Sequence, residues 1–315
     1  MLKKYPFFLP LAGCRGQCVY CDQRAITGIT EVPSPEFVRR ELKKLNEPRE
    51  ICYFGGSFCR FPKERIKEYL DAAVQASPKG STLRFSTYPG DLRDDELRAL
   101  VKGYPISRVE LGIPTLDPAV LAACRREADP QKVFEDIALL MEDSLPVGVQ
   151  MMIGLPGQSR ESSLNDIERL AALKGAQRWE LRLYPCLVIA GTELEALWRG
   201  GKYIPLTVEE AALWGGEFIE RALVLGFVPI RIGLQETKAL AARAVAGPHH
   251  PALGELILAE AEARRLAKNS PKGPWRVPRR GLSMFTGHGR FGIKRLAIHA
   301  AMTENEAEAR IIFER

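Results

Sequence analysis

The stretch Ala12-Gly13-Cys14-Arg15-Gly16-Gln17-Cys18-Val19-Tyr20-Cys21-Asp22 places three cysteines within eight residues. One loop with this spacing can offer three thiolates to a single metal centre, and soft thiolates suit iron–sulfur clusters or zinc. A structural zinc site needs four ligands, and neither a second tight cysteine pair nor a nearby histidine completes one. A redox CxxC pair would use Cys18 and Cys21 but leave Cys14 without a role. The pattern therefore favours an iron–sulfur cluster in which one iron has no protein ligand.

Short apolar runs alternate with amphipathic segments on both sides of this stretch. The runs are continuously apolar or β-branched, as is typical of parallel strands covered by helices. Because six strand–helix units are too few to close an eight-stranded barrel, we expect an α/β fold with a partial (βα)6 parallel barrel. Such barrels carry their chemistry at the carboxyl ends of the strands, and the cysteines follow the first strand. The predicted strands cover residues 7–11, 51–54, 82–87, 108–112, 148–153 and 179–184.

The pattern changes near residue 207, which divides the chain into a core at 1–206 and a small C-terminal α/β extension at 207–315, packed on the core. In the extension, residues 208–225 and 251–267 have helical patterns and residues 227–232 read as a strand. Residues 269–281 are rich in Pro, Lys and Arg, so we expect an exposed connector there. Ser34 is a predicted helix N-cap, with Pro35 at the first helical position.

The composition is that of an ordinary globular protein, with 46% hydrophobic and 27% charged residues. No stretch approaches the roughly 20 apolar residues of a membrane span, and Pro6 and Pro10 break the short apolar opening that at first looks like a signal peptide. Seven cysteines, an odd number with three crowded together, argue against a secreted disulfide framework. We therefore expect a cytoplasmic protein without a membrane partner. The net charge of +6 is compatible with a nucleic-acid partner.

The CxxxCxxC spacing with Tyr20 directly before the last cysteine resembles the signature of the radical S-adenosylmethionine (SAM) superfamily. The resemblance implies a [4Fe–4S] cluster held by Cys14, Cys18 and Cys21, with SAM chelated to the open iron. It further implies reductive cleavage of SAM to a 5′-deoxyadenosyl radical that abstracts a hydrogen from the substrate. The electron would come from an external donor of the flavodoxin or ferredoxin type. The sequence assigns no catalytic side chain beyond these ligands and indicates no oligomeric state.

Further motifs follow the second to fifth predicted strands. Tyr53-Phe54-Gly55-Gly56-Ser57-Phe58 resembles the family's glycine-rich segment, so Gly55, Gly56 and Ser57 are expected to contact the methionine part of SAM. By the same likeness Ser86, Glu110 and Ile153 are candidates for ribose and adenine contacts. A strand-end salt bridge is the alternative role for Glu110, and ordinary core packing is the alternative for Ile153.

The run 183–194, LYPCLVIAGTEL, followed by Trp198 and Gly201-Lys202-Tyr203, is similar to the radical SAM half of the Elongator catalytic subunit family. That family modifies wobble uridines of tRNA, so the resemblance implies tRNA or another RNA as the substrate. We expect no counterpart of the family's acetyltransferase domain in these 315 residues, since only some 60 residues follow Glu255. Ile113-Pro114-Thr115 replaces a Val-Gln-Ser segment, so the complete Elongator reaction is not expected to carry over.

Two alternatives remain open at the level of the sequence. One is a radical SAM enzyme that acts on a small molecule such as a tetrapyrrole. The other is a structural module that binds a metal cluster without catalysis.

Several remaining features read more simply as structural. Residues 287–292 match GxGxxG but lack the βαβ context of a dinucleotide site, so a loop is expected. Lys294, Arg295, Arg279 and Arg280 form a basic segment that is first interpreted as a solvated face, with contact to an RNA backbone as the alternative. His249 and His250 suggest a rigid turn. The other four cysteines are expected to be buried thiols, although Cys59 and Cys186 follow strand ends and could face the site.

Overall fold

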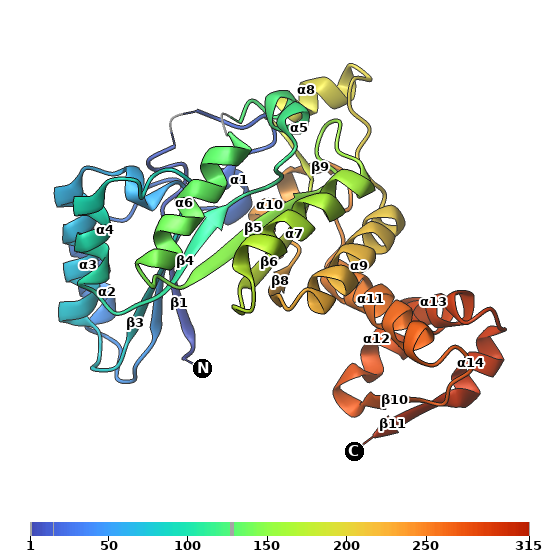
Figure 1. Ribbon diagram of the computed structural model, residues 1–315. Coiled ribbons are helices and arrows are strands. Elements are labelled where there is room, and N and C mark those ends of the chain that lie inside the picture. The colour runs from blue at the N-terminus through green and yellow to red at the C-terminus, as the bar shows by residue number, and fades with distance from the viewer. Residues whose placement is uncertain (1, 15, 127–128, 315) are drawn as a thin grey trace.

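The computed structural model describes residues 2–14, 16–126 and 129–314. Seven parallel strands form one sheet in the order of the sequence, which is the topology of an open half-barrel (Figure 1). The predicted fold class is confirmed, with one strand more than the six expected. The strands are β1 (Lys4–Phe8), β2 (Glu50–Phe54), β3 (Thr82–Thr87), β4 (Ile106–Gly112), β5 (Val147–Ile153), β6 (Glu180–Pro185) and β8 (Val228–Ile232). The seventh strand, β8, pairs with β6 and so belongs to the sheet rather than to a separate extension.

Helices cover the outer, convex face of the sheet (Figure 1). They begin where the sequence offers capping residues: the Ser34 hydroxyl accepts a hydrogen bond from the amide of Phe37, as predicted. Asp94, Asp117 and Asp129 cap later helices in the same way. The covering helices are α2 (Pro35–Leu42), α3 (Lys63–Ala76), α4 (Asp95–Lys102), α5 (Pro118–Ala123), α6 (Pro130–Glu142), α7 (Arg160–Lys174) and α9 (Val208–Val224).

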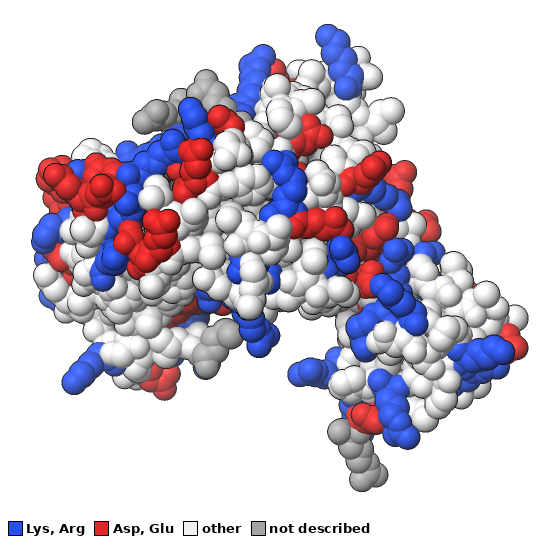
Figure 2. Space-filling model, in the orientation of Figure 1, with Lys and Arg blue, Asp and Glu red and all other residues white. Residues whose placement is uncertain are grey.

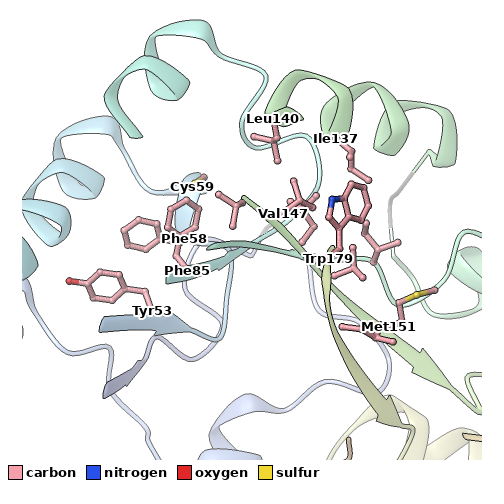
Figure 3. Packing of buried hydrophobic residues seen from close by; sticks show 14 of the residues in the cluster. Tyr53, Phe58, Cys59, Phe85, Ile137, Leu140, Val147, Met151 and Trp179 are labelled. Atoms are coloured by element: carbon pink, nitrogen blue, oxygen red, sulfur yellow. The ribbon is translucent and has the colours of Figure 1, made fainter. Parts of the chain in front are cut away.

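The main hydrophobic core lies between these helices and the convex face of the sheet. Tyr53 and Phe58 stack with their ring centroids 5.0 Å apart, and Phe85 lies against Phe58 at 5.1 Å. Figure 3 shows this aromatic group on one side of the core and Trp179 with aliphatic residues on the other. The same core includes Trp214 of α9 and Phe227 next to β8. The domain division predicted at residues 206 and 207 therefore falls inside a continuous core.

The concave face of the sheet, in contrast, carries a buried network of ion pairs. Arg84 on β3 is 2% exposed at its side chain and contacts three carboxylates. Its guanidinium lies 3.0 Å from Glu50, 2.5 Å from Glu110 and 2.7 Å from Glu180, on strands β2, β4 and β6. Arg182 also pairs with Glu110, at 2.9 Å. One side chain thus ties four strands together from inside the half-barrel.

Residues 263–314 form a smaller unit, here called the C-terminal lobe, which projects to one side of the barrel (Figure 1). It has its own core, which includes Trp275, Val277 and Phe285. The segment 269–281 is mostly exposed, as expected, but it is not a mere connector, because β10 lies in it and buries Trp275 and Val277 in the lobe core. The elements are the second half of α11 (Leu253–Asn269), β10 (Trp275–Pro278), α12 (Leu282–Thr286), α13 (Phe291–His299), α14 (Glu304–Arg310) and β11 (Ile311–Glu314), with β10 and β11 parallel.

Short elements complete the fold. Helices α1 and α10 lie against each other, and β7 pairs antiparallel with β9. No helix among the described residues is long and apolar enough to cross a membrane. These elements are α1 (Gln23–Thr27), β7 (Val188–Ile189), α8 (Glu193–Arg199), α10 (Lys238–Arg243), β9 (Ala244–Ala246) and the 3-10 turns η1 (Phe58–Arg60), η2 (Arg279–Gly281) and η3 (His288–Arg290).

The first prediction concerns Arg84. Replacement Arg84→Leu would leave buried carboxylates without their partner, which typically costs about 3–5 kcal/mol. Burial raises the pKa of Glu180, but the hydrogen bond and charge of Arg84 outweigh it and hold that pKa below its ordinary value of 4.5. The Arg84 contribution is therefore complete above pH 4.5 and is lost as the pH falls below it.

Urea unfolding should accordingly show a large loss of stability for Arg84→Leu at pH 7 and a smaller one near pH 4. Arg221→Leu provides the control, because Arg221 pairs with Glu168 at an exposed site and such pairs contribute about 1 kcal/mol or less. Equal losses for the two variants, or a loss at Arg84 that does not change with pH, would contradict the central role of this network.

Candidate active site

The cysteine loop and the glycine-rich loop interlock at the carboxyl edge of the sheet. A Cβ atom on Gly13 would lie 2.2 Å from the carbonyl oxygen of Ser57, and one on Gly56 would lie 1.9 Å from that of Ala12. Both glycines have positive φ angles, +73° and +36°. The amide of Ser57 donates to the carbonyl of Ala12 at 2.6 Å. Glycine is required at both positions because the two backbones pass in direct contact.

Gln23, in the first turn of α1, fastens the same two loops. Its side-chain oxygen accepts hydrogen bonds from the amides of Leu11 at 2.6 Å and Gly56 at 2.8 Å. The Asp22 carboxylate caps α1 by accepting from the amide of Ala25. Sequence reasoning missed Gln23, and no spacing or motif distinguishes it from an ordinary helical glutamine.

The middle of the cysteine loop, at Val19, is held from its other side by Cys124 and by the run 183–203. The amide of Val19 donates to the carbonyl of Cys124 at 3.2 Å, and its carbonyl accepts from the amide of Leu194 at 2.8 Å. The Val19 side chain is buried in an apolar cluster with Leu194 and Tyr203. The Elongator-like run therefore supports the backbone between Cys18 and Cys21.

A cavity of about 430 Å³ opens beside these loops. The three loop cysteines, Gly55, Gly56, Ser57 and Ser86 all line it. The structure thus brings together, at one cavity, the predicted cluster ligands and four of the six predicted SAM contacts.

The other two predicted SAM contacts, Glu110 and Ile153, are not among the described residues that line this cavity. Ile153 is fully buried on the helix-covered face of β5, because its neighbour Met152 faces the cavity and side chains alternate along a strand. Glu110 is on the concave face but is bound by Arg84, Arg182 and Gln150. Both residues have the alternative roles considered from the sequence, core packing for Ile153 and a salt bridge for Glu110.

The three loop thiols differ from the other cysteines in exposure. Cys14 is exposed and Cys18 and Cys21 are partly exposed, whereas the remaining four are buried. Cys59 and Cys186 are not found in the lining of either cavity described here. Burial, then the neighbouring Cys18 and Cys14, raise the pKa of the Cys21 thiol to about 12. Bound metal would favour its thiolate, since metal binding requires and stabilises the deprotonated ligand.

The donor set fits a multinuclear cluster better than a single ion. Within residues 2–14, 16–126 and 129–314, no three His, Cys, Asp or Glu side chains are arranged to hold one metal ion. A cubane cluster instead distributes its thiolates over different irons. Three sulfur ligands on one loop can meet that requirement.

An arginine–tyrosine–arginine stack forms the cavity wall beside the thiols. The guanidinium groups of Arg60 and Arg126 lie 4.2 Å and 4.7 Å from the ring centroid of Tyr88. Arg126 approaches the Cys18 sulfur at 3.6 Å, and Arg60 is held by Asp91 at 2.5 Å. Asp91 also accepts a hydrogen bond from the Ser57 hydroxyl. Two positive charges therefore border a site where thiolates would carry negative charge.

A second cavity, of about 700 Å³, adjoins the first and shares Tyr20, Cys21 and Gly55 with it. It lies between the edge strands β1 and β8, where the half-barrel is open. Lys4 and Arg231 come from these two strands. Phe8, Phe54 and Arg182 add aromatic surface and positive charge, with the Arg182 guanidinium 4.7 Å from the Phe54 ring.

The remaining sequence motifs are structural. Residues 287–290 form a turn before α13, in which His288, Gly289 and Arg290 have positive φ angles, and Phe291 and Gly292 begin the helix. Gly292 is needed for packing, since a Cβ there would lie 2.4 Å from the carbonyl of Met284. His249 is in a turn and pairs with Glu236 at 3.0 Å.

The exposure of the thiols predicts which of them react. In the metal-free, reduced protein, an alkylating reagent should modify Cys14 and Cys18 first under native conditions. Cys21 should react more slowly, because its raised pKa of about 12 leaves little thiolate. The other four cysteines should react only after unfolding. Peptide mass spectrometry after timed labelling measures this directly. Rapid labelling of Cys52 or Cys124, both buried here, would contradict the described packing.

Comparison with known proteins places this site in a family. Residues 8–170 match the model of the Radical SAM superfamily, and residues 179–265 match the Radical_SAM C-terminal domain. The tRNA uridine(34) acetyltransferase of Methanocaldococcus jannaschii is 29% identical over 193 residues, which are 54% of this chain and 36% of that protein. Elongator complex protein 3 of Schizosaccharomyces pombe is 29% identical over 183 residues, 52% of this chain and 34% of that protein.

The solved structure of archaeal Elp3 from Methanocaldococcus infernus, with an N-terminal deletion, superimposes with a TM-score of 0.61 at 23% identity. The match covers 84% of this chain and 63% of that one, and it shows the same fold. This chain spans about a third of the length of the two curated relatives named here. Because the superfamily model covers more than half of its residues, the chain belongs to the radical SAM superfamily.

Proposed function

We propose that this protein is an enzyme that cleaves SAM reductively at a [4Fe–4S] cluster in order to modify tRNA or another RNA. The observation that carries the proposal is the meeting of three accessible cysteines and the glycine-rich loop at one cavity. Membership of the superfamily implies SAM and a [4Fe–4S] cluster as the cofactors.

In this proposal Cys14, Cys18 and Cys21 bind the cluster. When bound, the cluster and SAM supply a 5′-deoxyadenosyl radical by one-electron cleavage of the sulfonium. Gly55, Gly56, Ser57 and Ser86 would contact SAM, since all four line the cavity beside the cysteines. The hydroxyl of Ser57 is bonded to Asp91, its amide to the carbonyl of Ala12 and its carbonyl to the amide of Arg60, so Ser57 would contact SAM mainly by packing against it.

The other wall residues would position ligands and exclude water. Arg126 offsets the negative charge of the thiolates, through its approach to Cys18. The amide nitrogen of Gln150 donates to Ser86 at 3.0 Å and to Glu110 at 2.6 Å. Because both hydrogens of this side-chain amide are engaged, the side-chain carbonyl oxygen of Gln150 is the atom that remains to accept a hydrogen bond at the cavity. Met152 and Tyr184 line both cavities and limit access of water.

RNA is proposed as the substrate because the named relatives are a tRNA uridine(34) acetyltransferase and an Elongator complex protein. The second cavity supports this choice. Its aromatic residues suit a nucleobase, and Lys4 and Arg231 suit phosphate. An external flavodoxin or ferredoxin would supply the electron, and we place the protein in the cytoplasm.

The cofactor chemistry can be tested by anaerobic reconstitution with iron and sulfide, reduction with dithionite and addition of SAM. The wild-type protein should show an iron–sulfur absorption band and form 5′-deoxyadenosine, measured by mass spectrometry. Cys18→Ala should lose both. Cys52→Ala is the matched control, because Cys52 is buried away from both cavities and should keep both.

Failure of the wild-type protein to assemble a cluster would refute the proposal. A stable cluster without 5′-deoxyadenosine, even with tRNA present, would favour a cluster-binding module without catalysis. Formation of 5′-deoxyadenosine with no change in the nucleosides of added tRNA would redirect the search to small-molecule substrates.

A further inference from the structure

The positive charge of the chain is concentrated in one segment. Residues 263–303 contain ten Lys and Arg and no Asp or Glu, and acidic residues resume only at Glu304. Subtracting these ten from the 45 Lys and Arg of the chain leaves 35, against all 39 Asp and Glu. The rest of the protein therefore has a net charge of −4, and the ten cations of this segment make the net charge of the whole chain positive.

This segment makes up most of the C-terminal lobe, and the fold turns its charges outward. Trp275, Phe285 and Leu296 fill the lobe core. Many polar side chains of the same elements lie on the outside, and Figure 2 shows several separate groups of Lys and Arg on the visible surface of the lobe. The family models end at residue 265, so most of the lobe lies beyond the segments that they match.

Some of these cations are neutralised within the protein. Arg264 and Arg295 contact the buried Glu260, and Arg290 contacts Glu308. Four others have no carboxylate within ion-pair distance among the residues that the structure describes, and all four are exposed. They are Lys272, Arg279, Arg280 and Lys294.

The lobe is held firmly against the barrel through α11. The first half of this helix contributes Leu253, Ile257 and Ala261 to the barrel core, and its second half contributes to the lobe core. Gly216 on α9 allows close packing, since a Cβ there would lie 2.4 Å from the Cβ of Glu260. The Glu260 carboxylate, 1% exposed, is also bonded to His299 of α13 at 2.8 Å.

We propose that the C-terminal lobe is a docking surface for the phosphate backbone of the substrate RNA. The inference rests on the proposed function, in that it takes RNA as the substrate. Two of the four cations without a described carboxylate partner, Arg279 and Arg280, are arginines, whose planar guanidinium matches two phosphate oxygens at once. A surface of unpaired cations attracts any nucleic-acid backbone without reading its sequence, so the lobe would hold the RNA while the barrel cavities select the nucleotide.

The test measures binding and is independent of SAM chemistry. Fluorescence anisotropy with an unmodified tRNA transcript compares wild-type protein with the triple variant Arg279→Glu, Arg280→Glu, Lys294→Glu. We expect at least about tenfold weaker binding at about 150 mM salt. The slope of log K against log salt should become shallower by about 2–3, as expected when three phosphate contacts are lost.

A matched control reverses three exposed charges at the amino-terminal edge of the sheet, the edge opposite the cysteine loop. Lys43, Lys79 and Arg178 precede β2, β3 and β6 and likewise have no described carboxylate partner. The variant Lys43→Glu, Lys79→Glu, Arg178→Glu has the same net charge as the lobe variant and should bind almost as the wild type does. Arg279→Lys with Arg280→Lys should retain most of the binding. Fluorescence of Trp275, buried in the lobe core, would verify that the lobe variant is folded.

Each outcome separates this inference from the proposed function. Equal weakening in the lobe and control variants would overturn the docking surface while leaving RNA as the substrate. Absence of tRNA binding by the wild type would overturn both the docking surface and RNA as the substrate. Formation of 5′-deoxyadenosine would still establish the radical chemistry in that case. A third outcome is that the wild type binds poly-glutamate as tightly as tRNA and that the lobe variant loses this binding. The lobe would then be a docking surface for an acidic protein rather than for RNA.

Discussion

The fold depends on how Arg84 is neutralised inside the half-barrel. In an open barrel of seven strands whose helices pack on the convex face, an apolar lining of the concave face would be open to solvent. The chain instead buries an arginine of β3 among Glu50, Glu110 and Glu180 on strands β2, β4 and β6. Buried charges are tolerated only when they are paired and hydrogen-bonded, so the network fixes the mutual positions of the strands that carry it. Because Glu110 also binds Arg182 and Gln150, the same network orients residues at the cavities.

The site is built on this framework by backbone contacts rather than by long side chains. Gly13 and Gly56 let two loops touch, Gln23 fastens them together, and Val19 is held between the carbonyl of Cys124 and the amide of Leu194. Residues from distant parts of the sequence thus fix the three cysteines. In a metal-free protein this support leaves the thiols accessible but keeps their backbone close to a ligand-ready arrangement.

The sequence predicted the parts that depend on local pattern. Continuous apolar runs located the strands to within a few residues, and capping residues such as Ser34 located helix starts. The cysteine and glycine motifs converge as expected. What it missed depends on tertiary context: Gln23 and Arg126 act through partners far away in the chain. The side-chain position of Ile153 could not be predicted, because one residue of register decides which face of β5 a side chain occupies. The segment 269–281 looked exposed from its charges, yet Trp275 and Val277 alternate into a core.

Helix α11 passes without interruption from one hydrophobic core into the other. A loop between the barrel and the lobe would absorb an insertion or deletion, but a helix does not. Adding one residue between Ala261 and Ala263 would turn the lobe by about 100° and advance it by about 1.5 Å. The length of α11 therefore sets the orientation of the lobe in discrete steps, and most changes of length would point its charged surface in a new direction. Natural variation in this protein should then spare the length of α11 while tolerating changes in the length of surface loops.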